Sequence, residues 1–253
     1  MVGGESSEGA DGSAVPGAET EVVVWLSPAA AGPGDHDLLD DVERAALGRL
    51  RRPADRDRYV AAHAHRRRLV AAHLGVPARH VRFTPAACPL CGGPHGRPVV
   101  AGGGVEVSLS RTSDLVAVAL APAVVGVDVE ALDRAVGIRD LESALHPAER
   151  ATVPDRTAAL RLWVRKEAYL KGRGTGLGVD PAGVDVSTDP PGWRIVDVAA
   201  GPAHLAAVAV MVGPTGGRGS PSAAPAAPAG TVRLTTYGPT APSLRARPAP
   251  TGP

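Results

Sequence analysis

The chain has 253 residues, enough for one domain or two small ones with a hydrophobic core. Its 27 basic and 26 acidic residues give a net charge of +1, so no overall field favours binding to nucleic acid or to a membrane surface. No apolar run approaches the roughly 20 residues of a membrane span. The N-terminus also lacks the basic start and apolar run of a signal peptide. We therefore expect a soluble, cytoplasmic protein.

The two ends of the sequence do not have the composition of a folded core. Residues 1–20 and 214–253 are rich in small residues, glycine and proline, and bury too little apolar surface to offset the entropy lost on ordering. We expect both segments to be disordered tails. One alternative stays open for TVRLTTY at 231–237, which reads either as an isolated strand or as part of the tail.

The folded part, 21–213, is predicted to mix helices and strands. In its first half the expected elements are a strand at 21–26, helices at 38–50 and 55–74, and a short strand at 81–83. A meander of three antiparallel strands is predicted next, at 105–110, 115–121 and 124–130. The remaining predictions are helices at 138–146 and 155–171, followed by strands at 184–187, 193–198 and 204–212. Each half would then hold helices and a few strands, although the sequence contains no readable repeat.

The two lysines of the chain lie close together. Lys166 and Lys171 both fall in WVRKEAYLK (163–171), whereas the sequence has 25 arginines in all. An ammonium is a compact point charge and a guanidinium is a planar fork, so the two are not interchangeable. This stretch is therefore where we look for chemistry.

The carboxylates of GVDVE (126–130) form a second candidate. Asp128 and Glu130 are two residues apart on a predicted strand, so their side chains face the same side. Such a pair is compatible with a solvated strand face, or with a hard divalent cation such as Mg²⁺.

The helical pattern around the lysines favours a functional reading. Leu160, Val164 and Ala168 form an apolar stripe with Trp163, and Glu167 and Lys171 fall in the middle of that stripe. Charged groups on a buried-looking stripe must be paired or bind a metal. Arg161 and Arg165 are predicted to point away from the stripe, and Lys166 to flank it at the edge. The glycine-rich GRGTGLG that follows (172–178) is expected to be a flexible loop beside the site.

Together these motifs resemble the paired signature of the 4′-phosphopantetheinyl transferases of the Sfp type. GVDVE and WVRKEAYLK match the family pattern at every defining position, in order and at the expected separation. Upstream, GRP (96–98) and SLSRTSD (108–114) are similar to two further family segments. The resemblance covers about 22–212.

The resemblance implies an α+β fold, a pseudo-dimer of two similar α+β subdomains at 21–121 and 122–213, with coenzyme A in the cleft between them. It implies Mg²⁺ held by Asp128, Glu130 and Glu167. Glu167 would also take, or help to take, the proton of the serine that is modified, and Lys171 would contact the pyrophosphate. Lys166 matches the other lysine of the motif and has a less defined role.

Contacts to coenzyme A are also implied by the resemblance. The family histidine that approaches the phosphates is replaced here by Arg111, which keeps phosphate donors but cannot become neutral. Arginines near the start of the 55–74 helix are expected at the ribose phosphate. The expected coenzyme-binding residues are Arg52, Arg58, Arg97, Ser110, Arg111, Thr112, Asp128 and Lys171.

Two other motifs have competing interpretations. HAHRRRLVAAH (63–73) is basic, but its arginines are spread around the helix, and we expect no nucleic-acid binding. Cys88, Cys91 and His95 have the spacing C-x₂-C-x₃-H, which is compatible with a structural zinc site or with two reduced cysteines in a surface loop. His80 is a possible fourth ligand.

The sequence as a whole indicates an enzyme of post-translational modification. We expect Mg²⁺-dependent transfer of 4′-phosphopantetheine from coenzyme A to a serine of an acyl or peptidyl carrier protein, with adenosine 3′,5′-bisphosphate released. A role in secondary metabolism is an analogy, and a monomer is expected because the two halves can complete one cleft. The alternative function is a catalytically inactive module of the same fold that binds coenzyme A or a carrier, for which Arg111 is the one feature in favour.

Overall fold

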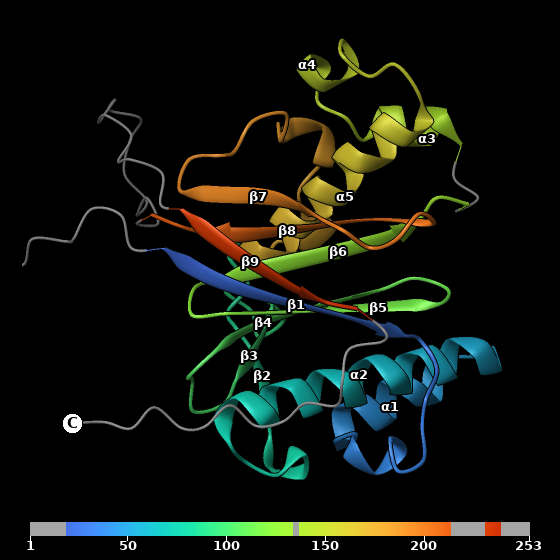
Figure 1. Ribbon diagram of the computed structural model, residues 1–253, viewed down its shortest axis with the longest axis vertical. Helices are drawn as coiled ribbons and strands as arrows, with labels where there is room; N and C mark the ends of the chain where they lie inside the picture. The colour runs from blue at the N-terminus through green and yellow to red at the C-terminus, as the bar shows by residue number, and fades with distance from the viewer. Residues whose placement is uncertain (1–18, 134–136, 214–230, 239–253) are drawn as a thin grey trace, which may run out of the picture.

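Two β-sheets lie face to face between two long helices (Figure 1). The computed structural model describes residues 19–133, 137–213 and 231–238. The first half contains β1 (Thr20–Pro28), η1 (His36–Leu38), α1 (Asp41–Arg49), α2 (Pro53–Leu74), η2 (Ala78–His80), β2 (Phe83–Pro85), β3 (Pro98–Val100), β4 (Glu106–Arg111) and β5 (Leu115–Ala121). The second half contains β6 (Val125–Ala131), α3 (Ile138–Ser143), α4 (Pro147–Arg150), α5 (Arg156–Arg173), η3 (Gly176–Gly178), η4 (Pro181–Gly183), β7 (Trp193–Val198) and β8 (His204–Met211), and β9 (Val232–Tyr237) follows.

The two halves share one topology, as the pseudo-dimer prediction requires. The first sheet has the strand order β4-β5-β1-β9, and the second has the order β7-β8-β6. In the first half, β1 pairs antiparallel with β5, and β5 pairs antiparallel with β4. In the second half, β6 pairs antiparallel with β8, and β8 pairs antiparallel with β7. The long helix of each half precedes the last two strands of that half: α2 precedes β4 and β5, and α5 precedes β7 and β8. The fold is therefore an α+β arrangement in which one unit occurs twice.

One apolar layer holds the two halves together, and two more pack a long helix onto the sheet of each half. The layer between the sheets includes Val24 and Ala117 from the first sheet and Val127, Val129 and Val208 from the second. The other face of the first sheet is covered by α2, and the other face of the second by α5. Alternation on β6 places its valines in the layer between the sheets, so Asp128 faces the side of α5.

Several sequence predictions need correction. β4 and β5 form the expected hairpin, but β6 does not continue the meander, because it starts the second sheet and pairs with β8. The predicted strand at 184–187 is absent, because Val184 O and Val186 N–H bond to the side chains of Lys166 and Glu149 rather than to a neighbouring strand. Helix α4 and strand β3 were not predicted.

The segment 231–237, which the sequence left open, forms a strand. β9 pairs in parallel with β1, and Tyr237 stacks on Trp25 with 4.0 Å between the ring centroids. The other parts of the predicted tails, from 1 to 18, 214 to 230 and 239 to 253, lie outside the described residues. Within the described residues, no helix combines the length and apolar character needed to cross a membrane.

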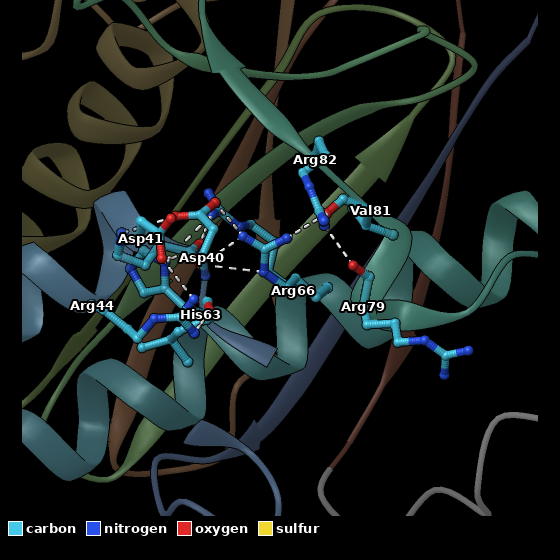
Figure 2. Close-up of polar contacts among 11 residues, drawn as sticks. Asp40, Asp41, Arg44, His63, Arg66, Arg79, Val81 and Arg82 are labelled. Atoms are coloured by element: carbon cyan, nitrogen blue, oxygen red, sulfur yellow. Dashed lines mark hydrogen bonds and ion pairs between the residues drawn. The ribbon is translucent and has the colours of Figure 1, made fainter. Parts of the chain in front are cut away.

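A buried glutamate, Glu43, joins α1 to α2 in the first half. Figure 2 shows Asp40, His63 and Arg66 at this junction. Glu43 closes a capping box with Asp40 at the start of α1, and its side chain is nearly fully buried. It accepts hydrogen bonds from Arg66 at 2.8 Å and from Arg67 at 2.6 Å, and it contacts His63 Nδ1 at 2.9 Å. Burial alone would raise the pKa of Glu43, but the bonds from His63 and Arg67 hold it well below its usual range.

An equivalent ion pair joins α4 to α5 in the second half. Glu149 closes the capping box of α4, and Lys166 Nζ lies 2.7 Å from its Oε2, with both side chains 0% exposed. Lys166 also donates to the carbonyl groups of Pro181 and Val184. Burial lowers the pKa of Lys166, and Glu149 opposes this shift. The prediction that Lys166 lies at the edge of the stripe is therefore wrong, because this side chain is fully enclosed.

The glycine of GVDVE allows β6 to approach α5 closely. A Cβ atom on Gly126 would lie 1.9 Å from Ala168 O and 2.4 Å from Gly172 N. These contacts are far below any real approach of a Cβ atom, so only glycine fits. This close approach brings the side chain of Asp128 to that of Lys171.

We expect Lys166→Ala to destabilise the protein strongly, because Glu149 would remain buried without its cation. The expected loss in the free energy of unfolding is about 3–5 kcal/mol, measured by urea denaturation. Arg161→Ala is the matched control on the same helix, since its pair with Asp197 is on an exposed surface and should change stability by less than about 1 kcal/mol. Equal effects of the two substitutions would contradict the buried pair.

We expect Gly126→Ala to lower stability by at least about 1–3 kcal/mol, because β6 and α5 must separate to admit the methyl group. The control is Gly48→Ala in α1, where a Cβ would meet nothing within 4 Å. That substitution should be neutral or slightly stabilising. Thermal unfolding of both variants measures the difference, and a tolerated Gly126→Ala would refute the tight contact.

We also expect Glu43 to contribute to stability in a pH-dependent way. A carboxyl group whose pKa is depressed on folding stabilises the protein above its unfolded pKa, about 4.3 for glutamate, and loses that contribution as the pH falls. The stability advantage of the wild type over Glu43→Gln should therefore shrink below that pH by up to about 1.4 kcal/mol per pH unit. Asp41→Asn, at an exposed site on α1, should leave the slope unchanged. Parallel profiles for wild type and Glu43→Gln would disprove the effect.

Candidate functional site

The site is built where the two halves meet, along β4 of the first sheet and β6 of the second. Ser108 and Ser110 alternate on β4 and face β6, while Val107 and Leu109 face α2. Ser108 Oγ accepts a hydrogen bond of 3.0 Å from the backbone N–H of Val127. The hydroxyl thus ties the two sheets together at a buried point.

The centre of the site is a hydrogen-bonded group of three side chains from three elements. Ser110 on β4 donates to Asp128 Oδ1 on β6 at 2.7 Å. Lys171, near the end of α5, donates to the same oxygen at 2.5 Å and to Ser110 Oγ at 3.0 Å. Residues far apart in the sequence, all expected at the coenzyme, therefore lie in contact.

Lys171 is fixed but not enclosed. Its side chain is 30% exposed, whereas that of Asp128 is 4% exposed. An ammonium has three N–H donors, and the bonds to Asp128 and Ser110 use two of them. One donor is left for an anion that approaches from solvent.

The second oxygen of Asp128 is suited to a cation. Asp128 Oδ2 is buried and has no hydrogen-bond partner among the described residues. A buried carboxylate oxygen without a donor is costly, and a hard cation satisfies it. The residues present therefore fit a bound Mg²⁺ at this oxygen.

The other two predicted metal ligands lie on the same elements. Glu130 follows Asp128 on the same side of β6, opposite Leu205 of β8, and Glu167 lies one turn before Lys171 on α5; both are half-buried. Within the described residues, these three carboxylates are not a group whose ligand atoms all lie within 4.8 Å of one another. Their joint role as ligands stays a prediction.

A second basic group lies at the end of β4. The guanidinium of Arg111 lies over the ring of Tyr59 on α2, 5.5 Å from its centroid. Burial lowers the pKa of Arg111, and the nearby positive charge of Arg58 lowers it further. Arg58 in turn forms an ion pair with Asp55. Two of the residues predicted to contact phosphate are therefore neighbours.

The remaining predicted contacts are more dispersed. Arg97 forms an ion pair with Glu106 on β4 and lies beside Gly174, the left-handed residue that ends α5. Thr112 donates its backbone N–H to Leu115 O in the β4–β5 turn. Arg52 is exposed at the start of α2 and makes no side-chain contact with the central group.

The structure also shows where the two motifs with competing interpretations lie, the basic segment 63–73 and the Cys/His motif 88–95. Two of the three arginines at 66–68 are buried and engage Glu43, so this run is not a basic surface patch. Cys88, Cys91 and His95 come together with their ligand atoms within 4.8 Å of one another, and His80 is not part of that group.

Sequence reasoning missed three contributors to the site. The alternation of Ser108 with Ser110 was a readable sign that both hydroxyls face one side. Gly126 was recognised only as a motif position, because its close approach to α5 depends on packing. Nothing in the sequence marked Tyr59 as the support of Arg111.

Comparison with known proteins supports the superfamily. A search of curated proteins found no match to this chain. Residues 124–211 match the family model of the 4′-phosphopantetheinyl transferase superfamily. This range begins just before β6 and ends with β8, so it coincides with the second structural unit and contains Asp128, Glu167 and Lys171. Within the second half of the chain, residues 124–211 are accordingly similar to the 4′-phosphopantetheinyl transferase superfamily.

Proposed function

We propose that the protein transfers 4′-phosphopantetheine from coenzyme A to a serine of an acyl or peptidyl carrier protein, as an enzyme of the Sfp type. The observation that carries this proposal is the contact of Ser110, Asp128 and Lys171 at the junction of the two halves. This contact combines a fixed cation with a buried carboxylate that has one oxygen unused. Two of its three residues lie in the segment that is similar to the 4′-phosphopantetheinyl transferase superfamily.

The reaction is a displacement at phosphorus. The serine oxygen of the carrier forms a bond to the phosphorus that bears the pantetheine arm. The bond between that phosphorus and the bridging oxygen breaks, and adenosine 3′,5′-bisphosphate leaves. The serine proton passes to Glu167, or to an acceptor that Glu167 positions.

Lys171 stabilises the negative charge that develops on the diphosphate. Its ammonium is held by Asp128 and Ser110 before substrate binds, so little reorganisation is needed during the reaction. Mg²⁺, held by Asp128 Oδ2 with Glu130 and Glu167, would neutralise the diphosphate further and orient it when bound.

The arginines surround the centre with phosphate donors. Arg58 and Arg111 are adjacent and present two permanent positive charges, which suits the ribose phosphate of coenzyme A. Because a guanidinium stays charged, Arg111 serves binding and cannot act as a base. Arg97, in the loop that follows β2, lies beside the turn that ends α5, the helix that carries Lys171.

The test is conversion of an apo carrier to its holo form. The purified protein, coenzyme A and Mg²⁺ should add one phosphopantetheine to at least one apo carrier domain in a panel from polyketide, peptide and fatty-acid synthases, as measured by mass spectrometry. Asp128→Asn should lower kcat/KM by about 10²–10³-fold. The matched control is Asp197→Asn, which removes a carboxylate that pairs with Arg161 and Arg165 away from the centre.

Three outcomes would decide against parts of this proposal. Coenzyme A binding without transfer to any carrier would favour the inactive binding module. Full activity of a folded Asp128→Asn variant would remove Asp128 from the mechanism. An equal loss in Asp197→Asn would indicate that the effect is on stability, and circular dichroism of both variants separates these cases.

A further inference from the structure

A closed loop between β2 and β3 carries a cluster of metal-ligating side chains away from the central group. The loop is pinned at its base, where the N–H of Ala86 donates to Arg97 O and the N–H of Gly96 donates to Ala86 O. At its tip, the ligand atoms of Cys88, Cys91 and His95 all lie within 4.8 Å of one another, and Cys91 Sγ is 3.0 Å from His95 Nε2. No other cluster of this kind occurs among the residues that the structure describes.

The donor atoms suit zinc better than Mg²⁺. Zinc binds cysteine sulfur at about 2.3 Å and histidine nitrogen at about 2.0–2.1 Å, and a tetrahedral site sets neighbouring ligand atoms about 3.5–3.8 Å apart. The three ligand atoms here are near enough to share one ion after small side-chain movements. Sulfur and imidazole are not the oxygen ligands that Mg²⁺ requires.

Backbone groups surround the two sulfurs. The N–H groups of Leu90 and Cys91 are directed at the thiol of Cys88. The N–H of Gly93 donates to Cys91 Sγ at 3.4 Å. Both cysteines therefore have backbone donors directed at sulfur, and such outer contacts orient the ligands of metal sites.

Two glycines at the tip of the loop, Gly92 and Gly93, allow its tight turn and the close approach of the ligands. Gly92 has a φ of +76°, which L side chains rarely adopt. A Cβ on Gly93 would lie 3.1 Å from the His95 ring and 3.4 Å from Cys91 Sγ, so a side chain there would crowd the cluster. An ordinary surface loop has no need to bring these three groups together so tightly.

We propose that this loop binds one Zn²⁺ through Cys88 Sγ, Cys91 Sγ and His95 Nε2. Water or another small ligand completes the tetrahedron. Two thiolates balance the charge of the ion, and neither cysteine is consumed in a disulfide. The site is structural, because the ion cross-links a loop that is otherwise ordered only by the backbone hydrogen bonds at its base and in its turns.

The loop connects this zinc site to the segment after α5. Leu90 lies against Gly178, where a Cβ would come within 2.9 Å of its side chain, and Arg97 lies against Gly174. Zinc therefore fixes the segment from which Arg97 forms its ion pair with Glu106. The consequence for coenzyme binding by Arg97 rests on the proposed function, whereas zinc binding itself does not.

The experiment is metal binding by the full chain under reducing conditions, without coenzyme A or carrier. Titration with Zn²⁺ against a chromophoric chelator should give about one tightly bound ion per chain. Cys88→Ser, Cys91→Ser and His95→Ala should each weaken binding at least about 100-fold. The matched control is His80→Ala, which changes an exposed histidine at the end of η2 that is outside the cluster, and this variant should bind like the wild type.

Cobalt gives a readout that does not depend on variants folding. Co²⁺ bound to the wild type should show thiolate-to-metal charge-transfer absorption and the strong visible bands of a tetrahedral site. Fewer than about 0.1 zinc ions per chain in the presence of excess metal would overturn the proposal. So would a cobalt spectrum without thiolate bands, or unchanged affinity in the His95→Ala variant. A protein that binds zinc but transfers nothing would refute only the proposed enzyme activity.

Discussion

A buried ion pair between a capping glutamate and a cation on the long helix organises each half of this molecule. In the first half Glu43 of α1 pairs with Arg67 of α2, and in the second Glu149 of α4 pairs with Lys166 of α5. Arg67 and Lys166 each lie eight residues before the left-handed glycine that ends the helix, Gly75 and Gly174. Each cation also donates to a backbone carbonyl in the segment after its helix, so one side chain fixes three pieces of chain.

This repeat explains why the two lysines of the sequence have separate tasks. Lys166 occupies the position that Arg67 occupies in the other half, and its ammonium is enclosed by one carboxylate and two carbonyl groups. With the helix fixed by that buried charge, Lys171 is presented to β6, and Gly126 lets it come within hydrogen-bond distance of Asp128. The geometry of the site thus depends on a structural ion pair that contains none of its residues.

Local patterns allowed most of the fold to be predicted from the sequence, and tertiary contacts account for the rest. β5 was predicted with its observed bounds, because an apolar run between turn residues has few alternatives. The helix predicted from residue 55 begins two residues earlier, at Pro53, since the missing N–H of proline is not needed at the first helical position. The depth of Lys166 could not be predicted, because periodicity gives the direction of a side chain and not what covers it. The strand order was equally hidden, since the alternation of β6 is the same in either sheet.

The parallel pairing of β9 with β1 has a consequence for how this protein is made. Arg233 of β9 forms an ion pair with Glu19, the residue before β1, and the two are 214 positions apart in the chain. Contacts of such long range are slow to form, since the loop between them must close first. On the ribosome, β1 must wait for β9, which is the last of the described strands. Until then its open edge exposes unpaired backbone groups to other nascent chains, which makes the period of synthesis the time of greatest risk of misassembly.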